Sequence, residues 1–348
     1  MTPRKILIIK LRYIGDVLLA TPVFAALRAR FPDSHLTALV NPGTEGVLVH
    51  NPDLDETWVL ERGGWLNQLR FLRALRARQF DCVIDLTDGD RSAILAMASG
   101  ASCRIGFNDE QRWRGRCYTH VAVREHPPRH RIERELSALD PLGIAAEIRK
   151  PVLLTCDEDD RTAVQLLRSL GVDLQGTLAT QPLVLFQPGA RYWFKAWPAE
   201  RFAALADLLT ARFGCRILIG GSANEREVGE RIARHSQCTP ILLHGTTSLP
   251  VYAAILKRAS LAVTNDNGLM HMAAAVGTPL VALFGPSHPA EWGPRGTVAE
   301  VLYKGLDCRV CFHPTCTRED ANCMKLIAVD EVFSAAARLL EQRRKSGG

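Results

Sequence analysis

The stretch from Thr264 to Gly285 constrains the fold more than any other part of this chain. It reads as a strand end, a polar loop at Asn265 to Gly268, a helix, a turn at Gly277 to Pro279 and a second buried strand. Such a unit belongs to a parallel sheet covered by helices. A helix N-terminus that opens with a glycine also favours phosphate, which indicates a nucleotide-linked ligand. The alternative is an ordinary turn of an α/β core.

The alternation of strands and helices runs through the chain twice. The first half begins with a strand at Lys5 to Lys10 and a helix at Asp16 to Phe31. The second restarts with a strand at Pro182 to Phe186 and a helix at Pro198 to Phe213. The polar, aperiodic segment Gly171 to Gln181 is the expected linker. Two doubly wound α/β halves predict a ligand at the carboxyl ends of the strands, between the halves.

This organisation predicts two domains, residues 1–172 and 173–328, followed by an amphipathic C-terminal helix in residues 329–348. The chain has 348 residues, of which 47% are hydrophobic and 23% charged, as in soluble globular proteins. No apolar run reaches the roughly 18 residues of a membrane-spanning helix, and the N-terminus lacks the features of a signal peptide. We therefore expect a cytoplasmic protein.

The net charge of +6 is too small to indicate nucleic acid as a partner. Arginines nevertheless gather between Arg104 and Arg134, where acidic residues are fewer. Such a cluster is either a solvated face or a patch for an anionic acceptor or an anionic membrane surface.

Four of the ten cysteines are grouped near the C-terminus, whereas the other six are scattered as expected for reduced thiols. The group could hold zinc, remain reduced or form a redox-sensitive local disulfide. Its members are Cys308, Cys311, Cys316 and Cys323.

The loop after the first strand ends in Gly15 and Asp16, where the first helix begins. Asp16 could cap that helix, or its carboxylate could serve as a general base in the ligand site. The loop is neither a GxGxxG dinucleotide fingerprint nor a Walker A motif.

Two loops of the second half carry charged residues at strand ends. Arg191 and Lys195 precede a helix that starts near Pro198, an arrangement suited to pyrophosphate or to solvated surface cations. Glu225 follows the glycine pair at Gly220, where a carboxylate can bind ribose hydroxyls. Helix capping by neighbouring polar side chains is the competing interpretation there.

Asp266 and His271, in the stretch described first, also allow two interpretations. Asp266 either caps its helix or contacts the ligand, and His271 is either a core histidine or a site residue.

Together these segments resemble glycosyltransferase family 9, the ADP-heptose:lipopolysaccharide heptosyltransferases. The resemblance covers about Lys5 to Val332 and rests on KILIIKLRYIGDVLLATPVFAALR, QPGARYWFKAWPAERFAALA and NDNGLMHMAAAVGTPLVALFGPSHPAEWGP. It implies a GT-B fold, with two Rossmann-like domains facing each other across a cleft and a C-terminal helix returning toward the first. The first domain would bind the acceptor and the second the nucleotide sugar.

The resemblance also implies the reaction and its residues. Heptose would pass with inversion, without metal or other cofactor, from ADP-heptose to the anionic inner core of lipopolysaccharide, at the cytoplasmic face of the inner membrane. Asp16 matches the catalytic base, and Arg12 lies on the acceptor side. Asn267 departs from the usual serine or threonine. The residues that match donor-binding positions are Ala190, Arg191, Lys195, Glu225, Asp266, Asn267, Gly268 and His271.

Two other functions fit the same segments. One is a GT-B transferase that uses another nucleotide sugar or a protein acceptor. The other is a non-catalytic protein that binds a nucleotide sugar.

Overall fold

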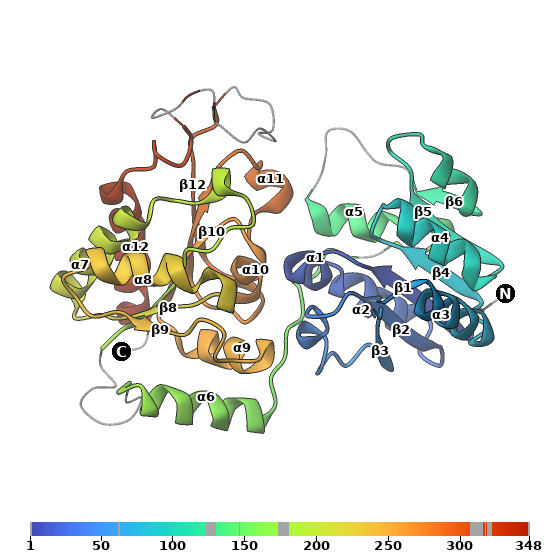
Figure 1. Ribbon diagram of the computed structural model, residues 1–348, viewed down its shortest axis with the longest axis horizontal. Coiled ribbons are helices and arrows are strands. Elements are labelled where there is room, and N and C mark those ends of the chain that lie inside the picture. Colours follow the sequence, from blue (N-terminus) through green and yellow to red (C-terminus); the bar gives the residue numbers. More distant parts are fainter. Residues whose placement is uncertain are drawn as a thin grey trace. The chain divides into compact units, whose positions relative to one another are not determined.

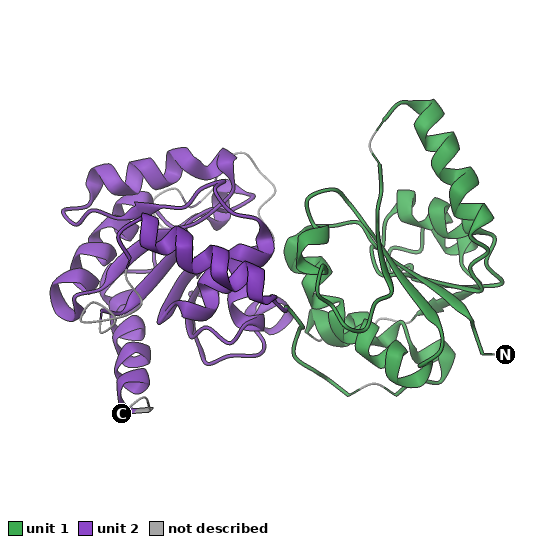
Figure 2. Cartoon of the chain, turned by 90° about the horizontal axis from the view of Figure 1, so that it is seen from below, with its two compact units in different colours: residues 1–153 green, residues 154–348 purple. Residues whose placement is uncertain are grey.

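The computed structural model describes residues 2–61, 63–122, 130–145, 147–172, 181–306, 316, 318 and 322–346. The chain divides into two compact units, Met1–Leu153 and Leu154–Gly348 (Figure 2). Each unit contains a parallel six-stranded sheet with helices (Figure 1), which confirms the expected α/β fold.

The sheet of unit 1 has the strand order β3-β2-β1-β4-β5-β6. All of these strands are parallel, and the order in which the chain adds them reverses between β1 and β4, which is where ligands of doubly wound folds bind. The register aligns Ile9 of β1 with Asp85 of β4. The strands are β1 (Lys5–Lys10), β2 (His35–Val40), β3 (Glu56–Val59), β4 (Cys82–Asp85), β5 (Cys103–Phe107) and β6 (His120–Ala122).

The helix expected from Asp16 to Phe31 is wrong in one respect, because two helices occupy this segment. Proline lacks an N–H, so Pro22 cannot bond the carbonyl of Leu18 as a continuous helix would require. The Thr21 hydroxyl donates to that carbonyl instead, at 2.8 Å. The helices of unit 1 are α1 (Ile14–Leu19), α2 (Thr21–Arg30), α3 (Trp65–Ala77), α4 (Asp90–Ser99) and α5 (Arg131–Ser137).

The sheet of unit 2 repeats the same topology in the order β12-β11-β10-β7-β8-β9. Its switch point therefore lies between β7 and β10. The strands are β7 (Leu183–Gln187), β8 (Arg216–Ile219), β9 (Ile241–Leu242), β10 (Leu261–Asn265), β11 (Leu280–Phe284) and β12 (Ala299–Tyr303).

Helices α7 and α12 share one buried core with the second sheet, including Phe202 and Leu339 (Figure 1). The C-terminal helix α12 therefore packs against α7 and strands β10 to β12 of unit 2. The helices of unit 2 are α6 (Asp157–Ser169), α7 (Ala199–Phe213), α8 (Arg226–His235), α9 (Leu249–Arg258), α10 (Gly268–Ala275), α11 (Pro289–Trp292) and α12 (Val329–Ser346).

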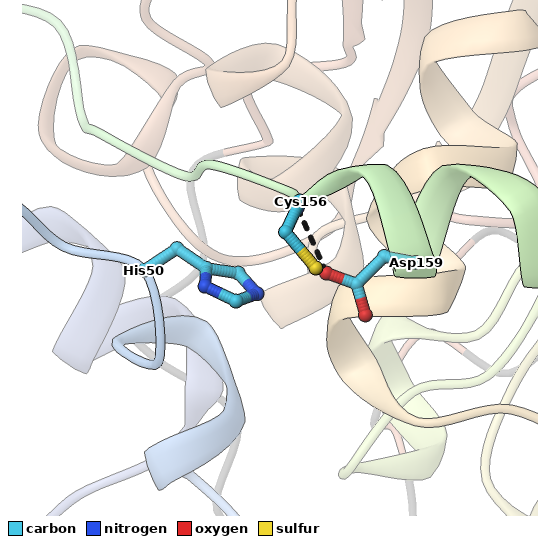
Figure 3. Close-up of side chains that lie close together, drawn as sticks. All are labelled: His50, Cys156 and Asp159. Carbon is cyan, nitrogen blue, oxygen red and sulfur yellow. Dashed lines mark hydrogen bonds between the residues drawn. The ribbon is translucent and has the colours of Figure 1, made fainter.

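Helix α6 lies in unit 2, where it packs on α9. The sequence-based boundary after residue 172 places this helix in the first domain instead, and residues 173–180 of the expected linker lie outside the described residues. At the start of α6 the Cys156 backbone N–H donates to Asp159 Oδ2 at 3.0 Å (Figure 3). None of the described helices is long and apolar enough to cross a membrane.

Candidate functional site

The loop after β1 brings Asp16 to the switch point of unit 1. Tyr13 begins α1 with φ 24° and ψ 156°, a conformation that non-glycine residues rarely adopt. The Leu11 N–H donates to Thr87 Oγ1 at 2.8 Å, which ties this loop to the one after β4. Asp16 lies in the first turn of α1 and is half-buried. The cap position belongs to Tyr13, so helix capping does not account for Asp16.

A buried ion pair lies beside this loop, and the sequence analysis missed it. Lys10, at the end of β1, is 1% exposed, and its ammonium group donates to Glu135 Oε1 at 2.7 Å and to the Leu86 carbonyl at 2.8 Å. Arg131 Nε lies 2.8 Å from the same Glu135 oxygen. The sequence signal that could have revealed this pair is Lys10, which follows four apolar residues of the strand, since a buried lysine requires a partner.

These charges act on Asp16. Burial raises the pKa of its carboxyl group above the usual value, and the positive charges of Lys10 and Arg131 oppose that shift, whereas Glu135 adds to it. A carboxylate with a raised pKa is a better proton acceptor than an ordinary aspartate. The environment of Asp16 therefore suits a general base.

Arg12 is exposed in the same loop and lies against the loop after β4. A Cβ atom placed on Gly89 would lie 3.6 Å from Nη2 of Arg12. The segment after β1 thus presents Asp16 and Arg12 at the carboxyl edge of the sheet, next to the loop after β4.

Much of the basic stretch is neutralised internally. Asp88, which has a positive φ of 56°, lies 2.8 Å from Arg114 and 2.7 Å from Arg134. Both arginines are nearly buried, and their ion pairs fix the loop after β4 rather than present free positive charge. Arg112 similarly pairs with Glu110 at 2.6 Å. Arg124 and Arg129 lie outside the described residues.

In unit 2, the loops after β7 and β10 meet at the switch point. Lys195 Nζ donates to Asp266 Oδ2 at 2.6 Å. The helix cap is Asn267, whose Oδ1 accepts from the Met270 N–H at 3.0 Å and whose amide donates to the Gly189 carbonyl at 2.7 Å. Asp266 is therefore not the cap of α10. Its carboxylate instead holds Lys195 beside the start of this helix at Gly268.

Glu225 reaches the loop after β7 from the loop after β8. Its Oε2 accepts from the backbone N–H and the hydroxyl of Ser222, at 2.7 and 2.8 Å. A Cβ atom on Gly189 would lie 1.9 Å from Glu225 Oε1, so a side chain at this position would have to displace the carboxylate. The carboxylate thus lies directly against the peptide that precedes Ala190. This contact brings together the predicted loop that carries Arg191 and Lys195 and the predicted loop that carries Glu225.

The remaining predicted residues differ in how far they are exposed to solvent. Arg191 is exposed, with its guanidinium 5.4 Å from the centre of the Tyr192 ring. Ala190 is half-buried beside Gly189. His271 is 3% exposed within α10, as a core histidine would be. Of the grouped cysteines, Cys308 and Cys311 lie outside the described residues, and Cys316 and Cys323 are half-buried.

We expect Gly189→Ala to weaken binding of a nucleoside diphosphate sugar, because the methyl group would displace the Glu225 carboxylate. Isothermal titration calorimetry with the donor measures this. Gly64→Ala is the matched control, since a Cβ atom at Gly64 meets nothing within 4 Å. Equal affinities of the two variants would contradict a role of Glu225 in donor binding.

Comparison with known proteins decides the family. The model of glycosyltransferase family 9 (heptosyltransferase) matches residues 68–322. The chain belongs to this family. It is 30% identical over 347 residues to lipopolysaccharide heptosyltransferase 3 of Escherichia coli strain K12, covering 95% of this chain and 97% of that protein.

Solved structures of the family have the same fold. A family 9 glycosyltransferase from Veillonella parvula matches with a TM-score of 0.84 and 27% identity over 97% of both chains. The Escherichia coli ADP-heptose lipopolysaccharide heptosyltransferase II matches with a TM-score of 0.81 and 24% identity, covering 98% of this chain and 99% of that one. The GT-B assignment is thereby confirmed, and the protein is a glycosyltransferase.

Proposed function

We propose that this glycosyltransferase transfers heptose from ADP-heptose to the inner core of lipopolysaccharide, with inversion at the anomeric carbon and with Asp16 as general base. The proposal rests on family membership along nearly the whole chain, together with the placement of Asp16 at the switch point of unit 1. The relatives named above are lipopolysaccharide heptosyltransferases.

Asp16 would remove the proton from the attacking hydroxyl group of the acceptor. A single inverting displacement needs one base and no covalent intermediate, because the acceptor oxygen replaces the ADP oxygen directly. Burial supplies the raised pKa that makes the carboxylate an effective acceptor. The fixed backbone of the loop, tied to Thr87, holds the carboxylate in place.

Unit 2 would bind the donor. The departing ADP gains negative charge on its phosphate, and Lys195 with the N-terminal N–H groups of α10 would stabilise that charge without requiring a metal ion. Glu225 would accept hydrogen bonds from the ribose, since its Oε1 borders the loop after β7. Ala190 and Arg191, next to it, would contact the diphosphate through backbone N–H and guanidinium groups.

Arg12 would contact the anionic acceptor from the loop that carries Asp16. Its exposure leaves the guanidinium accessible, in contrast to Arg114 and Arg134, whose charges are already paired. We further propose that the protein works at the cytoplasmic face of the inner membrane as a peripheral protein, because its acceptor is a glycolipid.

The deciding experiment combines reconstitution with genetics. Purified protein, ADP-heptose and lipopolysaccharides truncated at successive core sugars should yield one heptosylated product, and the core of a deletion strain should be truncated at the same position by mass spectrometry. Anomeric configuration by NMR tests inversion, and full activity in EDTA tests metal independence. Transfer from GDP- or UDP-sugars but not from ADP-heptose would contradict the proposal.

Lys195→Ala should weaken ADP-heptose binding, because Lys195 supplies the positive charge nearest the start of α10. The expected loss is on the order of tenfold or more, the scale of one charge-assisted contact to phosphate. Calorimetry measures it, and Lys257→Ala is the control, because Lys257 precedes the amino end of β10 and contacts Thr155, whereas Lys195 and Asp266 follow the carboxyl ends of β7 and β10. Unchanged affinity would remove Lys195 from the donor site.

A further inference from the structure

Helix α3 exposes large apolar side chains to solvent. Trp65 is 70% exposed, Leu66 54% and Leu69 43%. All three lie in the first turns of one helix, and Trp65 and Leu69, four residues apart, share one side of it. Single exposed apolar residues are ordinary on protein surfaces, but a contiguous group of this size marks a contact surface.

The exposure does not result from poor anchoring of the helix. The opposite side of α3 is buried through Phe71 and Leu75, which belong to the core of unit 1. Phe71 stacks on Trp58 with ring centroids 4.5 Å apart. The helix is therefore fixed on unit 1 by one face, and its exposed apolar side chains lie on another face. Figure 1 shows where α3 lies in this unit.

Positive charge accompanies the outward apolar group. Arg70, Arg73 and Arg76 are exposed on α3, and the helix contains no aspartate or glutamate. At 3.6 residues per turn, Trp65, Leu66, Leu69, Arg70, Arg73 and Arg76 fall on the side of the helix away from Phe71 and Leu75. We refer to these six residues as the α3 face.

Arg76 continues this face toward the next helix. Its Nη1 lies 1.3 Å from where a Cβ atom of Gly100 would be, so its guanidinium covers the C-terminal end of α4. Met97, three residues earlier on α4, is 51% exposed. The neighbouring helix thus adds apolar surface next to the α3 face.

We propose that the α3 face docks on an anionic phospholipid surface. Tryptophan and leucine beside arginine are the side chains that a membrane interface accommodates together, since the rings and aliphatic groups enter the acyl boundary and the guanidinium groups reach the phosphates. The convex, acid-free helix face matches a flat anionic surface in charge. A protein partner or a second copy of this chain would have to supply acidic side chains and a groove for the helix. The experiment below separates binding to vesicles from self-association.

This inference names the surface that would hold the protein at the membrane. It rests on the proposed function only for the expectation that the protein works at a membrane. Vesicle binding is measured without donor or acceptor, so its failure is separable from a failure of heptosyl transfer.

The experiment is flotation of the full chain with vesicles of phosphatidylcholine, with and without about one third phosphatidylglycerol. We expect binding to the anionic vesicles only, and weaker binding at high salt because the arginine contribution is screened. The variants W65S/L69S and R70E/R73E should each lower the partition coefficient by about tenfold or more. Both should keep wild-type turnover on a delipidated acceptor, which shows that they fold.

Matched controls alter equally exposed residues of unit 2. Val298→Ser removes an apolar side chain that is 62% exposed, and Arg234→Glu reverses one exposed arginine of α8. Both should bind vesicles like the wild type. A double variant that still floats would overturn the proposal, as would equal losses in the controls. Wild-type dimers in analytical ultracentrifugation that W65S/L69S converts to monomers, without vesicle binding, would assign the face to self-association instead.

Discussion

Asp16→Asn is expected to lower turnover by roughly 10²-fold or more while leaving ADP-heptose affinity nearly unchanged. Asparagine keeps the size and polarity of the side chain but cannot accept the proton of the acceptor hydroxyl. The proposed donor residues Lys195, Glu225 and Asp266 all belong to unit 2, so the substitution in unit 1 leaves them intact. Steady-state kinetics with the lipopolysaccharide acceptor and calorimetry with the donor measure the two quantities separately.

The pH profile gives a second test of the same role. Burial raises the pKa of Asp16 from its usual value of 3.8, so the acidic limb of kcat/KM should lie above that value. Activity falls as the pH drops through this pKa, because the protonated carboxyl group can no longer act as a base.

Asp53→Asn is the control for both measurements. Burial also raises the pKa of Asp53, but this residue precedes the amino end of β3, whereas Asp16 follows the carboxyl end of β1 in the parallel sheet. It should keep wild-type turnover and the same acidic limb. Near-normal turnover of Asp16→Asn would remove Asp16 from the base role.

The three candidate loops could be predicted from the sequence because their signals are local. Asp16 directly follows an apolar strand and a glycine, and Lys195 and Asp266 follow two further strands of the same kind. In parallel sheets the carboxyl ends of strands meet at one edge, so position after a strand already predicts convergence. The structure confirms that Lys195 and Asp266 converge.

Interactions between distant residues could not be predicted in the same way. Lys10 and Glu135 are 125 residues apart, and nothing local to either residue identifies its partner. The pairing of Arg134 with Asp88, across 46 residues, likewise turned an apparent basic patch into a neutralised cluster. Single-sequence patterns report exposure and periodicity, whereas charge compensation depends on the tertiary fold.

Some differences between the expected and the observed elements have causes that are visible in the sequence. Pro22 ended α1, and the loss of its backbone N–H was visible in the sequence. The assignment of the α10 cap required geometry, because Asp266 and Asn267 are both good caps and only hydrogen bonding distinguishes them. Strand β5 and the edge strands β6 and β12 were not predicted, because they are short or only partly buried and lack a long apolar run.

Glu135→Gln is expected to destabilise the protein by about 3–5 kcal/mol, because it leaves the buried Lys10 ammonium group without its counter-charge. Burial alone would raise the pKa of Glu135, but Lys10, Arg131 and Arg134 outweigh it, and the pKa lies below its usual value of 4.5. A depressed folded-state pKa means that Glu135 stabilises the native state above pH ~4.5 and loses that contribution as the pH falls. Urea denaturation at neutral pH measures the change.

The double variant K10M/E135Q separates an ion-pair effect from a packing effect. Methionine fills the volume of the lysine stem without a charge, so the double variant should recover most of the lost free energy of unfolding. Arg131 also loses its counter-charge in this variant, but its Nε, 2.8 Å from Glu135 Oε1, keeps the amide oxygen of the glutamine as a hydrogen-bond acceptor.

The same pair of variants also probes Asp16. Glu135 raises the pKa of Asp16, whereas Lys10 lowers it. Glu135→Gln should therefore move the acidic limb of kcat/KM to lower pH, and the double variant should return it toward the wild-type position. A double variant as unstable as Glu135→Gln, with an unmoved acidic limb in both, would show that the buried pair neither balances charge in unit 1 nor sets the basicity of Asp16.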